Sequence, residues 1–406
     1  MSSVLPRSRY RPAVAFILVT ALLDVMAMGL VIPVLPTLIE EFAGSNAQAG
    51  VWNGVLVALW AAMQFLCSPV IGALSDRFGR RPVLLISTVG LSLDWALMAL
   101  APDLWWLAVG RIIGGMTSSS FTAVFAYMAD ITEPEERSKG FGWIGAAFSA
   151  GFVAGPALGG VLGDIDPRLP FWVASGLSAL AFLYGLLVLP ESLPPERRMA
   201  FSWARANPLG SLRLLRSHPE LFGLSGTYFL LHFTHHVFSA VYVLYAGFRY
   251  GLSTLEIGLL LGAAGLLEMA VQGWLVGHVA RWLGDRRTMV LGFVFGASGL
   301  LAMALAPNAL WFALALIPNA LWAIAMPTMM SLMTARVSER EQGQLQGANN
   351  SVASIAGVAS PLFFGWVYSL TAATDAGFSF VVAAVTMLAA AALGFLVTRA
   401  GQRALG

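Results

Sequence analysis

Long apolar stretches separated by short polar segments make up most of the chain. Twelve of these stretches have the roughly 20 residues that a helix needs to cross the hydrocarbon core of a bilayer. A helix also satisfies its own backbone hydrogen bonds in lipid, so each stretch is predicted to be a membrane-spanning helix. The predicted helices cover residues 12–35, 50–72, 82–101, 104–127, 140–162, 170–190, 220–246, 255–277, 287–306, 309–332, 345–369 and 376–398.

The longest polar interval, residues 190–220, is rich in Pro and Arg and separates six predicted helices from six. Its two sides repeat each other at an offset of 205 residues, since GALSDRFGRRP from residue 72 corresponds to GHVARWLGDRR from residue 277. A repeat at half the chain length indicates a duplicated six-helix unit. We therefore predict an all-α membrane protein with twelve transmembrane helices in two pseudo-symmetric six-helix bundles, residues 1–190 and 220–406, joined by a cytoplasmic linker of residues 191–219.

The composition excludes a soluble globular protein. Of 406 residues, 58% are hydrophobic and 11% are charged, which is less than half the charged share of about 25% in soluble domains. The net charge of +2 gives no reason to expect a nucleic-acid partner. The single cysteine, Cys67, excludes an intrachain disulfide and implies no metal cluster. The first apolar stretch lacks a small-residue cleavage site, so it is expected to remain as a membrane helix.

Lys and Arg residues are distributed unevenly between the two sides of the predicted helices. With the N-terminus placed in the cytoplasm, 20 of the 23 basic residues fall in cytoplasmic segments. Only Arg168 and Arg249 fall on the other side, and Arg111 lies inside a predicted helix. Because cytoplasmic loops of membrane proteins carry the excess of positive charge, both termini are predicted to be cytoplasmic.

The segment GALSDRFGRRP, residues 72–82, concentrates charge in the cytoplasmic turn between predicted helices 2 and 3. Asp76 is expected to pair with an arginine or a helix N-terminus of the other half, which would close the cytoplasmic side in the outward-facing state. The alternative is a positive loop that only fixes topology, but topology requires Arg and neither Asp nor Gly. The residues predicted to gate the cytoplasmic side are Gly72, Asp76, Arg77, Gly79, Arg80 and Arg81.

Three carboxylates and one guanidinium lie inside the predicted helices. Asp24, Asp94 and Glu268 are each about 12–13 residues from a helix start, which places them roughly 18–20 Å deep, near the bilayer midplane. Charged groups at that depth are costly, and they mark proton or substrate paths. Arg111 needs a partner, for which Asp24 or a helix carbonyl is expected. These four residues are predicted to couple transport to protons, and structural bonding between helices is the alternative.

Polar side chains in the apolar helices are candidates for substrate contact. His232 and His236 are four residues apart, so a helix places them on one face, where Glu268 is expected to complete a proton-sensitive cluster. Metal binding and plain helix packing remain alternatives, and two histidines without a third ligand do not predict a metal site. The predicted substrate-binding residues are Gln64, His232, His236, Gln272, Asn349 and Asn350.

The stretch GFVAGPALGG, residues 151–160, places four glycines around one proline in predicted helix 5. Small residues let helices pack closely in lipid, and proline frees a backbone carbonyl and bends the helix. The alternative to a functional motif is ordinary small-residue packing. The residues concerned are Gly151, Gly155, Pro156, Gly159 and Gly160.

Several of these motifs resemble the major facilitator superfamily. Residues 72–81 match the family's loop signature G-x-L-A/S-D-R-x-G-R-R, and GRIIGGMTSSS carries Arg111 as in the family's helix 4. Residues 151–160 resemble the motif associated with antiporters, and LPES, residues 189–192, closes helix 6 as in drug exporters. Within the superfamily, the chain is similar over nearly its whole length to the bacterial tetracycline/proton antiporters. It departs from them at Glu268, where they have histidine, and at Gly296, where they have aspartate.

The resemblance implies a proton-coupled antiporter that exports tetracycline or a similar amphipathic drug across the bacterial inner membrane by alternating access. Its expected partners are the drug, protons and membrane lipid, and a monomer is the expected state. No cofactor is expected beyond the proton as coupling ion and a divalent metal carried by the substrate. The two departures favour a different drug or metabolite as an alternative substrate. A proton-coupled metabolite symporter and a membrane sensor share the fold, while an enzyme is not expected, because the sequence has no phosphate loop, nucleophile elbow or metal cluster.

Overall fold

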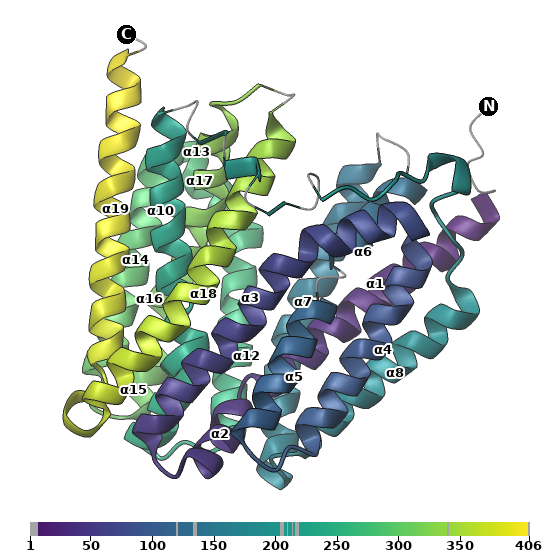
Figure 1. Ribbon diagram of the computed structural model, residues 1–406. Helices are drawn as coiled ribbons and strands as arrows, with labels where there is room; N and C mark the ends of the chain where they lie inside the picture. The colour runs from purple at the N-terminus through teal and green to yellow at the C-terminus, as the bar shows by residue number, and fades with distance from the viewer. Residues whose placement is uncertain are drawn as a thin grey trace. The chain divides into compact units, whose positions relative to one another are not determined.

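The computed structural model describes residues 7–118, 121–132, 136–203, 207–208, 210–212, 214–215, 219–338 and 341–404. The regular elements in these residues are helices, with no β-strand among them (Figure 1). Eleven of their helical stretches are long and apolar enough to cross a membrane. The predicted all-α membrane fold is therefore confirmed. The predicted linker, residues 191–219, includes residues 204–206, 209, 213 and 216–218, which lie outside the described part of the chain.

Predicted helix 4, residues 104–127, corresponds to two shorter helices. These are α5 (Leu104–Thr117) and α6 (Phe121–Ile131), and residues 119 and 120 between them are not among the described residues. The start of α5 is fixed by Asp103, whose side chain accepts hydrogen bonds from the backbone N–H groups of Trp105 and Trp106 at 2.9 and 3.1 Å. Such a cap satisfies donors that the first turn of a helix leaves free.

The other helices of the first half differ from the predicted spans mainly at their ends. Predicted helix 1 is divided near Pro33, which cannot donate a backbone hydrogen bond. Predicted helix 2 continues to Phe78 rather than ending at residue 72, so the helix extends past its apolar part into the charged segment. The observed helices are α1 (Arg7–Val31), α2 (Leu35–Ala43), α3 (Asn46–Phe78), α4 (Arg80–Ala99), α7 (Arg137–Ile165) and α8 (Leu169–Val188).

Three predicted helices of the second half are interrupted by other helical forms. Predicted helices 7 and 8 each contain a π-helical segment, and predicted helix 10 contains a short 3₁₀ segment. Pro318 lies next to that 3₁₀ segment and lacks the N–H that a continuous α-helix needs. The observed elements are α10 (Pro219–His235), η4 (Phe238–Tyr242), α11 (Val243–Tyr250), α12 (Thr254–Ala270), η5 (Val271–Leu275), α13 (Val276–Leu283), α14 (Asp285–Leu305), α15 (Ala309–Leu314), α16 (Leu316–Ala320), η6 (Leu321–Ile324), α17 (Ala325–Thr334), α18 (Gln342–Asp375) and α19 (Phe378–Ala404). Two short 3₁₀ turns, η2 (Pro195–Arg197) and η3 (Gly210–Leu212), lie between the halves.

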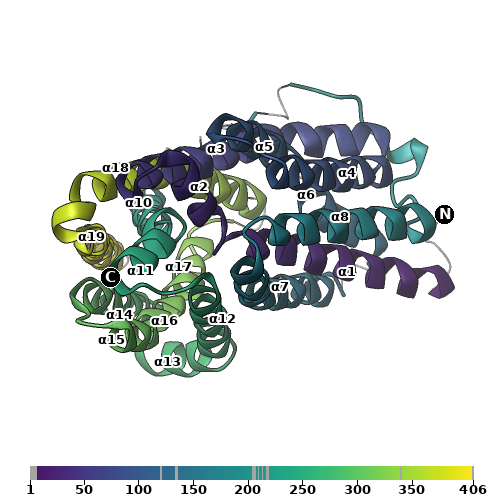
Figure 2. The same ribbon diagram turned by 90° about the horizontal axis from the view of Figure 1, so that it is seen from below.

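The chain divides into two compact units. Unit 1 comprises Met1–Leu38, Leu59–Pro208 and Thr254–Gly262, and unit 2 comprises Ile39–Ala58, Leu209–Ser253 and Ala263–Gly406. The first part of α3 therefore belongs to unit 2, and the first part of α12 belongs to unit 1. Within unit 1, α1 lies beside α7 and α8, and α4 lies beside α5 and α8 (Figure 2). Within unit 2, α14 lies beside α17 and α19, and α10 lies beside α18 and α19.

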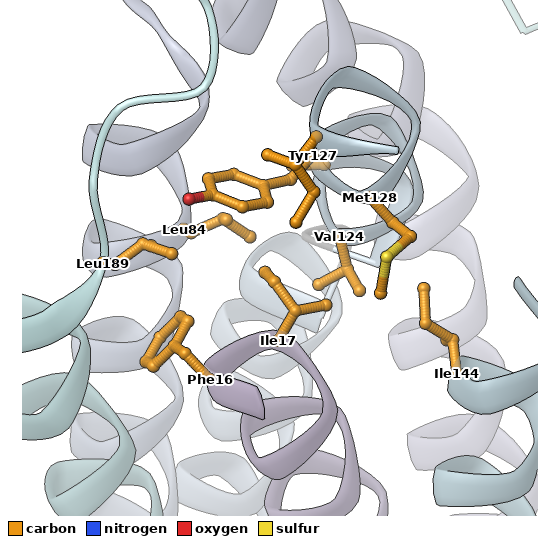
Figure 3. Close-up of a cluster of buried hydrophobic side chains, with 10 residues drawn as sticks. Phe16, Ile17, Leu84, Val124, Tyr127, Met128, Ile144 and Leu189 are labelled. Atoms are coloured by element: carbon orange, nitrogen blue, oxygen red, sulfur yellow. The ribbon is translucent and has the colours of Figure 1, made fainter. Parts of the chain in front are cut away.

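The core of unit 1 includes a cluster of buried hydrophobic side chains from four helices and from Leu189, which follows α8 (Figure 3). Its members include Phe16 and Ile17 of α1 and Tyr127 of α6. The hydroxyl group of Tyr127 donates a hydrogen bond to the carbonyl oxygen of Pro190 at 2.9 Å. This bond attaches the residues that follow α8 to the helix bundle, close to the charged loop described below.

In unit 2, the π-helical segment η4 is fixed by a side chain of α3. Asn53 is 1% exposed, and its Nδ2 donates to the carbonyl oxygens of Ser239 and Ala240 at 3.0 and 2.7 Å. A π-helix interrupts the regular α-helical hydrogen-bond ladder, so some of its carbonyl groups need other donors. Asn53 supplies two such bonds from one buried amide.

Candidate functional site

The buried carboxylate of Asp94 lies on α4 and faces α5. Asp94 is 0% exposed, and neither of its oxygen atoms accepts a hydrogen bond from the described residues. Its Oδ2 lies 4.0 Å from Nη2 of Arg111. Gly110 and Gly114 make room for it, since a Cβ on Gly110 would lie 3.0 Å from Oδ1 and a Cβ on Gly114 would lie 3.2 Å from Cγ. The carboxylate therefore has a cation beside it and free acceptor positions for a proton.

Arg111 on α5 is 8% exposed and is paired with Asp94, not with Asp24 or a helix carbonyl as the sequence suggested. Its guanidinium carbon lies 5.2 Å from the ring centre of Trp95, which follows Asp94 on α4. This stacking contact stabilises the cation in addition to the ion pair. The sequence did not reveal the pairing, because spacing within each helix does not tell which faces of two helices meet.

Asp24 lies on α1 where that helix crosses the glycine motif of α7. It is 5% exposed, and its Oδ1 has no hydrogen-bond partner in the described part of the chain. A Cβ on Gly151 would lie 2.9 Å from the carbonyl oxygen of Leu22 and 3.1 Å from Cβ of Val25. The turn of α1 that carries Asp24 thus packs against the first glycine of the motif.

The remaining glycines of this motif bring helix backbones into contact. A Cβ on Gly155 would lie 2.7 Å from Cα of Gly29 on α1, and a Cβ on Gly159 would lie 2.8 Å from Cα of Leu30. Gly160 faces α12, where a Cβ would lie 3.0 Å from Cα of Gly258. Close approach of this kind requires glycine. The helix α7 continues through Pro156 as a single element.

The charged loop between α3 and α4 forms an ion-pair network within unit 1. The guanidinium of Arg80 donates to Asp76 and Ser75 at 2.5 Å each, and its Nε donates to Asp130 of α6 at 3.2 Å. Arg80 is the first residue of α4, and its backbone N–H donates to Oε1 of Glu191 at 2.8 Å. The partner of Asp76 in this structure is therefore Arg80. Its pairing with a group of the other half stays a prediction.

Gly79 lies in close contact with Glu191 at this loop. Gly79 has a φ of +105°, a conformation that side chains with a Cβ rarely adopt, and a Cβ there would lie 2.7 Å from Cδ of Glu191. Glu191 also accepts the backbone N–H of Leu193 at 3.0 Å. Of the other predicted gating residues, Arg81 donates to the carbonyl oxygen of Leu186 at 2.8 Å, Arg77 is exposed, and Gly72 is half-buried on α3.

The sequence did not single out two acids of this network as functional residues. Asp130 lies near the end of α6, and Glu191 belongs to the LPES segment that follows α8. Each contacts Arg80, by its side chain or its backbone N–H. The sequence could have indicated these two acids, because each follows or ends a predicted helix on the same side of the membrane as the arginine-rich loop.

In unit 2, Glu268 of α12 is bonded to Trp322 of η6. The Nε1 of Trp322 donates to Oε1 of Glu268 at 2.9 Å. The ring of His235 stacks on Trp322 with centres 4.6 Å apart and an angle of 30°. The histidine nearest to this group is thus His235, which the sequence analysis did not select. The four-residue spacing of His232 and His236 favoured the helix face that carries those two residues. His235 was not selected because its partner, Trp322, is distant in sequence.

The two predicted histidines have ring contacts with residues other than Glu268. The ring of His232 packs on Tyr228 with centres 4.5 Å apart, and the ring of His236 lies 6.5 Å from that of His235. No hydrogen bond, ion pair or ring contact joins Glu268 to either predicted histidine among the described residues, and their grouping into one proton-sensitive cluster stays a prediction. The part of the chain that the structure describes contains no group of three or more His, Cys, Asp or Glu that could hold a metal ion.

The other predicted substrate-binding residues occupy different environments. Asn349 is 2% exposed, its Oδ1 lacks a partner in the described part of the chain, and its Nδ2 lies 3.5 Å from Sδ of Met330. Asn350 and Gln272 are exposed, and Gln64 of α3 is half-buried. Gln64 belongs to unit 1, while the other three belong to unit 2.

Comparison with known proteins identifies the family. The sequence profile of the Major Facilitator Superfamily matches residues 17–361. The chain belongs to the Major Facilitator Superfamily. The resemblance given by the sequence motifs is thereby confirmed, and this superfamily member is a multi-pass membrane protein.

Relatives within the superfamily are similar over most of their length. Tetracycline resistance protein, class C, of Escherichia coli is 38% identical over 376 residues, which are 93% of this chain and 94% of that protein. Tetracycline resistance protein, class G, of Vibrio anguillarum is 35% identical over 366 residues, covering 90% and 93% of the two chains.

Solved structures of the superfamily share the fold. The human organic anion transporter MFSD10 (TETRAN) is 26% identical, with a TM-score of 0.68 over 95% of this chain and 99% of that one. A bacterial homolog of the human lysosomal transporter Spinster, in an inward-facing and unoccupied conformation, is 17% identical. Its TM-score is 0.78 over 97% and 98% of the two chains, and this likeness concerns the fold alone.

Three acids of this superfamily member are thus embedded in membrane helices, two in unit 1 and one in unit 2. Asp94 has an arginine beside it and both oxygen atoms free of hydrogen bonds from the described residues, Asp24 has one oxygen without a partner there, and Glu268 is bonded to a neutral indole. Acids in such surroundings are suited to exchange a proton or to bind a cation, because a buried carboxylate stays charged only where a partner compensates it.

Proposed function

We propose that this protein is a proton-coupled antiporter that exports tetracycline or a similar amphipathic drug across the bacterial inner membrane by alternating access. One observation carries the proposal. Six tetracycline resistance proteins, of classes B, C, D, E, G and H, are 32% to 38% identical over 87% to 93% of this chain. Similarity that extends along the whole chain favours a shared transport activity over a shared fold alone.

In this proposal, Asp94 takes up and releases the proton within unit 1, and Arg111 responds to the change in its charge. A proton that enters from outside neutralises Asp94 and removes its attraction to Arg111, which lies 4.0 Å away. The arginine then becomes available to another acceptor, and the packing of α4 on α5 changes. Loss of the proton to the cytoplasm restores the pair. Asp24, which is buried on α1 beside the glycine motif, provides a second protonation site on the same path.

The loop network supports a gate on the cytoplasmic side. The uneven distribution of basic residues favours cytoplasmic termini, and in that orientation Asp76, Arg80 and Glu191 lie at the cytoplasmic membrane surface. Opening and closing then require that the hydrogen bonds of Arg80 to Asp76 and Asp130 be exchanged for others. The protein works with the drug, protons and lipid, as a monomer, and any divalent metal enters with the substrate.

A specific observation favours a different drug as a second candidate. By the resemblance, Gly296 stands where the tetracycline exporters carry an aspartate, and a Cβ there would lie 2.9 Å from Cε of Met387 and 3.0 Å from Cβ of Trp322. The site has no room for an aspartate without rearrangement of these side chains. The acid of this region is Glu268, on another helix, so the charge meets the substrate from a different direction.

Drug uptake into inverted membrane vesicles tests the proposal. Vesicles from an efflux-deficient bacterium that produces the protein are energised by respiration and given radiolabelled tetracycline. We expect accumulation that an uncoupler abolishes, and no accumulation in vesicles without the protein. Uptake of other amphipathic drugs but not of tetracycline would support the second candidate. Uptake that persists with the uncoupler would contradict proton coupling.

A further inference from the structure

The starting observation is the absence of a countercharge beside Glu268. This residue lies within an apolar, membrane-length stretch, Thr254–Leu283, and is half-buried. In the described part of the chain, no cationic side chain lies within 4.0 Å of its carboxylate, and its hydrogen-bond partner is the neutral indole of Trp322. Ionisable groups at such depth pair with an opposite charge or face a polar cavity. The compensating charge therefore has to come from a proton or from a bound ligand.

The second observation is that Glu268 uses one of its two oxygen atoms for this bond. Oε1 accepts the indole N–H at 2.9 Å, and no donor among the described residues reaches Oε2. A hydrogen bond to an ionised carboxylate is stronger than one between neutral groups and fixes its orientation. The bond leaves Oε2 as the atom that is available to a cation.

The third observation is that Trp322 is itself held in place by its neighbours. His235 stacks on it with ring centres 4.6 Å apart, and His235 in turn lies 5.8 Å from the ring of Phe238. On the side of α14, Gly296 lets the tryptophan sit close to the helix, since a Cβ there would lie 3.0 Å from Cβ of Trp322. Elements α10, α12 and α14 of unit 2 thus all contact Trp322 of η6.

From these contacts we propose that Trp322 is a positioning residue that holds the carboxylate of Glu268 for a positively charged group of the drug. The inference rests on the proposed function and names the substrate class as amphipathic, flat drugs that carry a cationic centre. His235 and Gly296 act through Trp322, because they fix its plane and its distance from α14. Trp322 contributes to drug affinity through Glu268 and not through its own packing.

A double-mutant cycle on the full-length protein in lipid nanodiscs tests this role. Equilibrium binding is measured with two probes, tetracycline with Mg²⁺ and ethidium, a flat permanent cation. Trp322→Phe keeps an aromatic ring but removes the N–H donor. We expect it to raise the Kd about tenfold in the wild-type background, the effect of losing a hydrogen bond to a charged group. In the Glu268→Gln background, where the charge is already lost, we expect less than about a twofold further change.

Control variants separate positioning from packing. Trp311→Phe makes the same exchange at a tryptophan of α15 that is 57% exposed, and it should leave both Kd values unchanged. If Trp322→Phe does not give folded protein, Gly296→Ala serves instead, because its Cβ would lie 3.0 Å from Cβ of Trp322 and is expected to shift that residue. It should weaken binding in the wild-type background only.

Each result decides between the two proposals. Equal losses from Trp322→Phe in both backgrounds would show a packing role and would overturn the inference, while leaving drug export intact. Weaker binding by Glu268→Gln with unchanged binding by Trp322→Phe would also overturn the inference, because Trp322 would then contribute nothing to drug affinity. Ethidium binding without tetracycline binding would overturn tetracycline export but support the cation site. Binding of neither probe by the wild-type protein would overturn both.

Discussion

Replacing Arg111 with methionine isolates the energetic role of the buried ion pair in unit 1. Methionine retains much of the apolar length that contacts Trp95 but removes the charge. Asp94 then remains 0% exposed with no cation beside it. Removal of one partner from a buried pair is far more costly than removal of both, because the remaining charge is uncompensated.

The distance in the structure sets the magnitude. Two unit charges 4.0 Å apart attract each other by about 4 kcal/mol at an effective dielectric constant of about 20. We therefore expect Arg111→Met to lower the free energy of unfolding by ~3–5 kcal/mol. The double variant Asp94→Asn/Arg111→Met should regain ~2 kcal/mol or more of that loss, because it leaves no unpaired charge.

Denaturant titration of the purified protein in detergent micelles measures these differences. Arg77→Met is a matched control, since Arg77 is an exposed arginine of the same unit, and its replacement should change the free energy of unfolding by less than about 1 kcal/mol. The reasoning is refuted if the double variant is no more stable than Arg111→Met, or if Arg111→Met is as stable as the wild type.

Two further substitutions test close contacts elsewhere in the structure. Gly114→Ala places a Cβ against the carboxylate of Asp94 and should destabilise the protein by ~1–3 kcal/mol and reduce transport, whereas Gly176→Ala, where a Cβ meets open space, should be neutral in thermal unfolding and uptake assays. Equal stability and equal uptake in the two variants would contradict close packing of Gly114 against Asp94. Asn53→Ala leaves the carbonyl oxygens of η4 without their donor and should lower the free energy of unfolding by ~1–3 kcal/mol, with faster hydrogen exchange confined to η4 and its neighbours. Unchanged exchange there would show that the π-helical segment does not depend on Asn53.

The hydrophobic pattern predicted the helices well, because length and apolar content are what a membrane requires of each span. It predicted single helices over 220–246 and 255–277, where the structure contains π-helical segments. The positions of such segments depend on partners from other helices, as the contact of Asn53 with η4 illustrates. Hydrophobicity along one helix carries no information about those partners.

The site was predictable at the level of residue type and less so at the level of pairing. Embedded charges are rare enough in membrane helices that Asp24, Asp94, Glu268 and Arg111 stand out from the sequence alone. Their partners depend on how helices face each other. Arg111 pairs with Asp94 rather than Asp24, and the histidine beside the indole partner of Glu268 is His235. Trp322 carried no signal, because it is one tryptophan among 13 in an apolar chain, where most such rings face lipid or pack between helices.

Proton release on drug addition tests most directly whether the embedded acids of unit 1 carry the coupling proton. Inverted vesicles are acidified by respiration, and a pH-sensitive dye reports the proton gradient when drug is added. We expect drug addition to release protons from vesicles with the wild-type protein. Asp24→Asn and Asp94→Asn should still bind drug but release none. Undiminished drug-driven proton release in both variants would contradict the account.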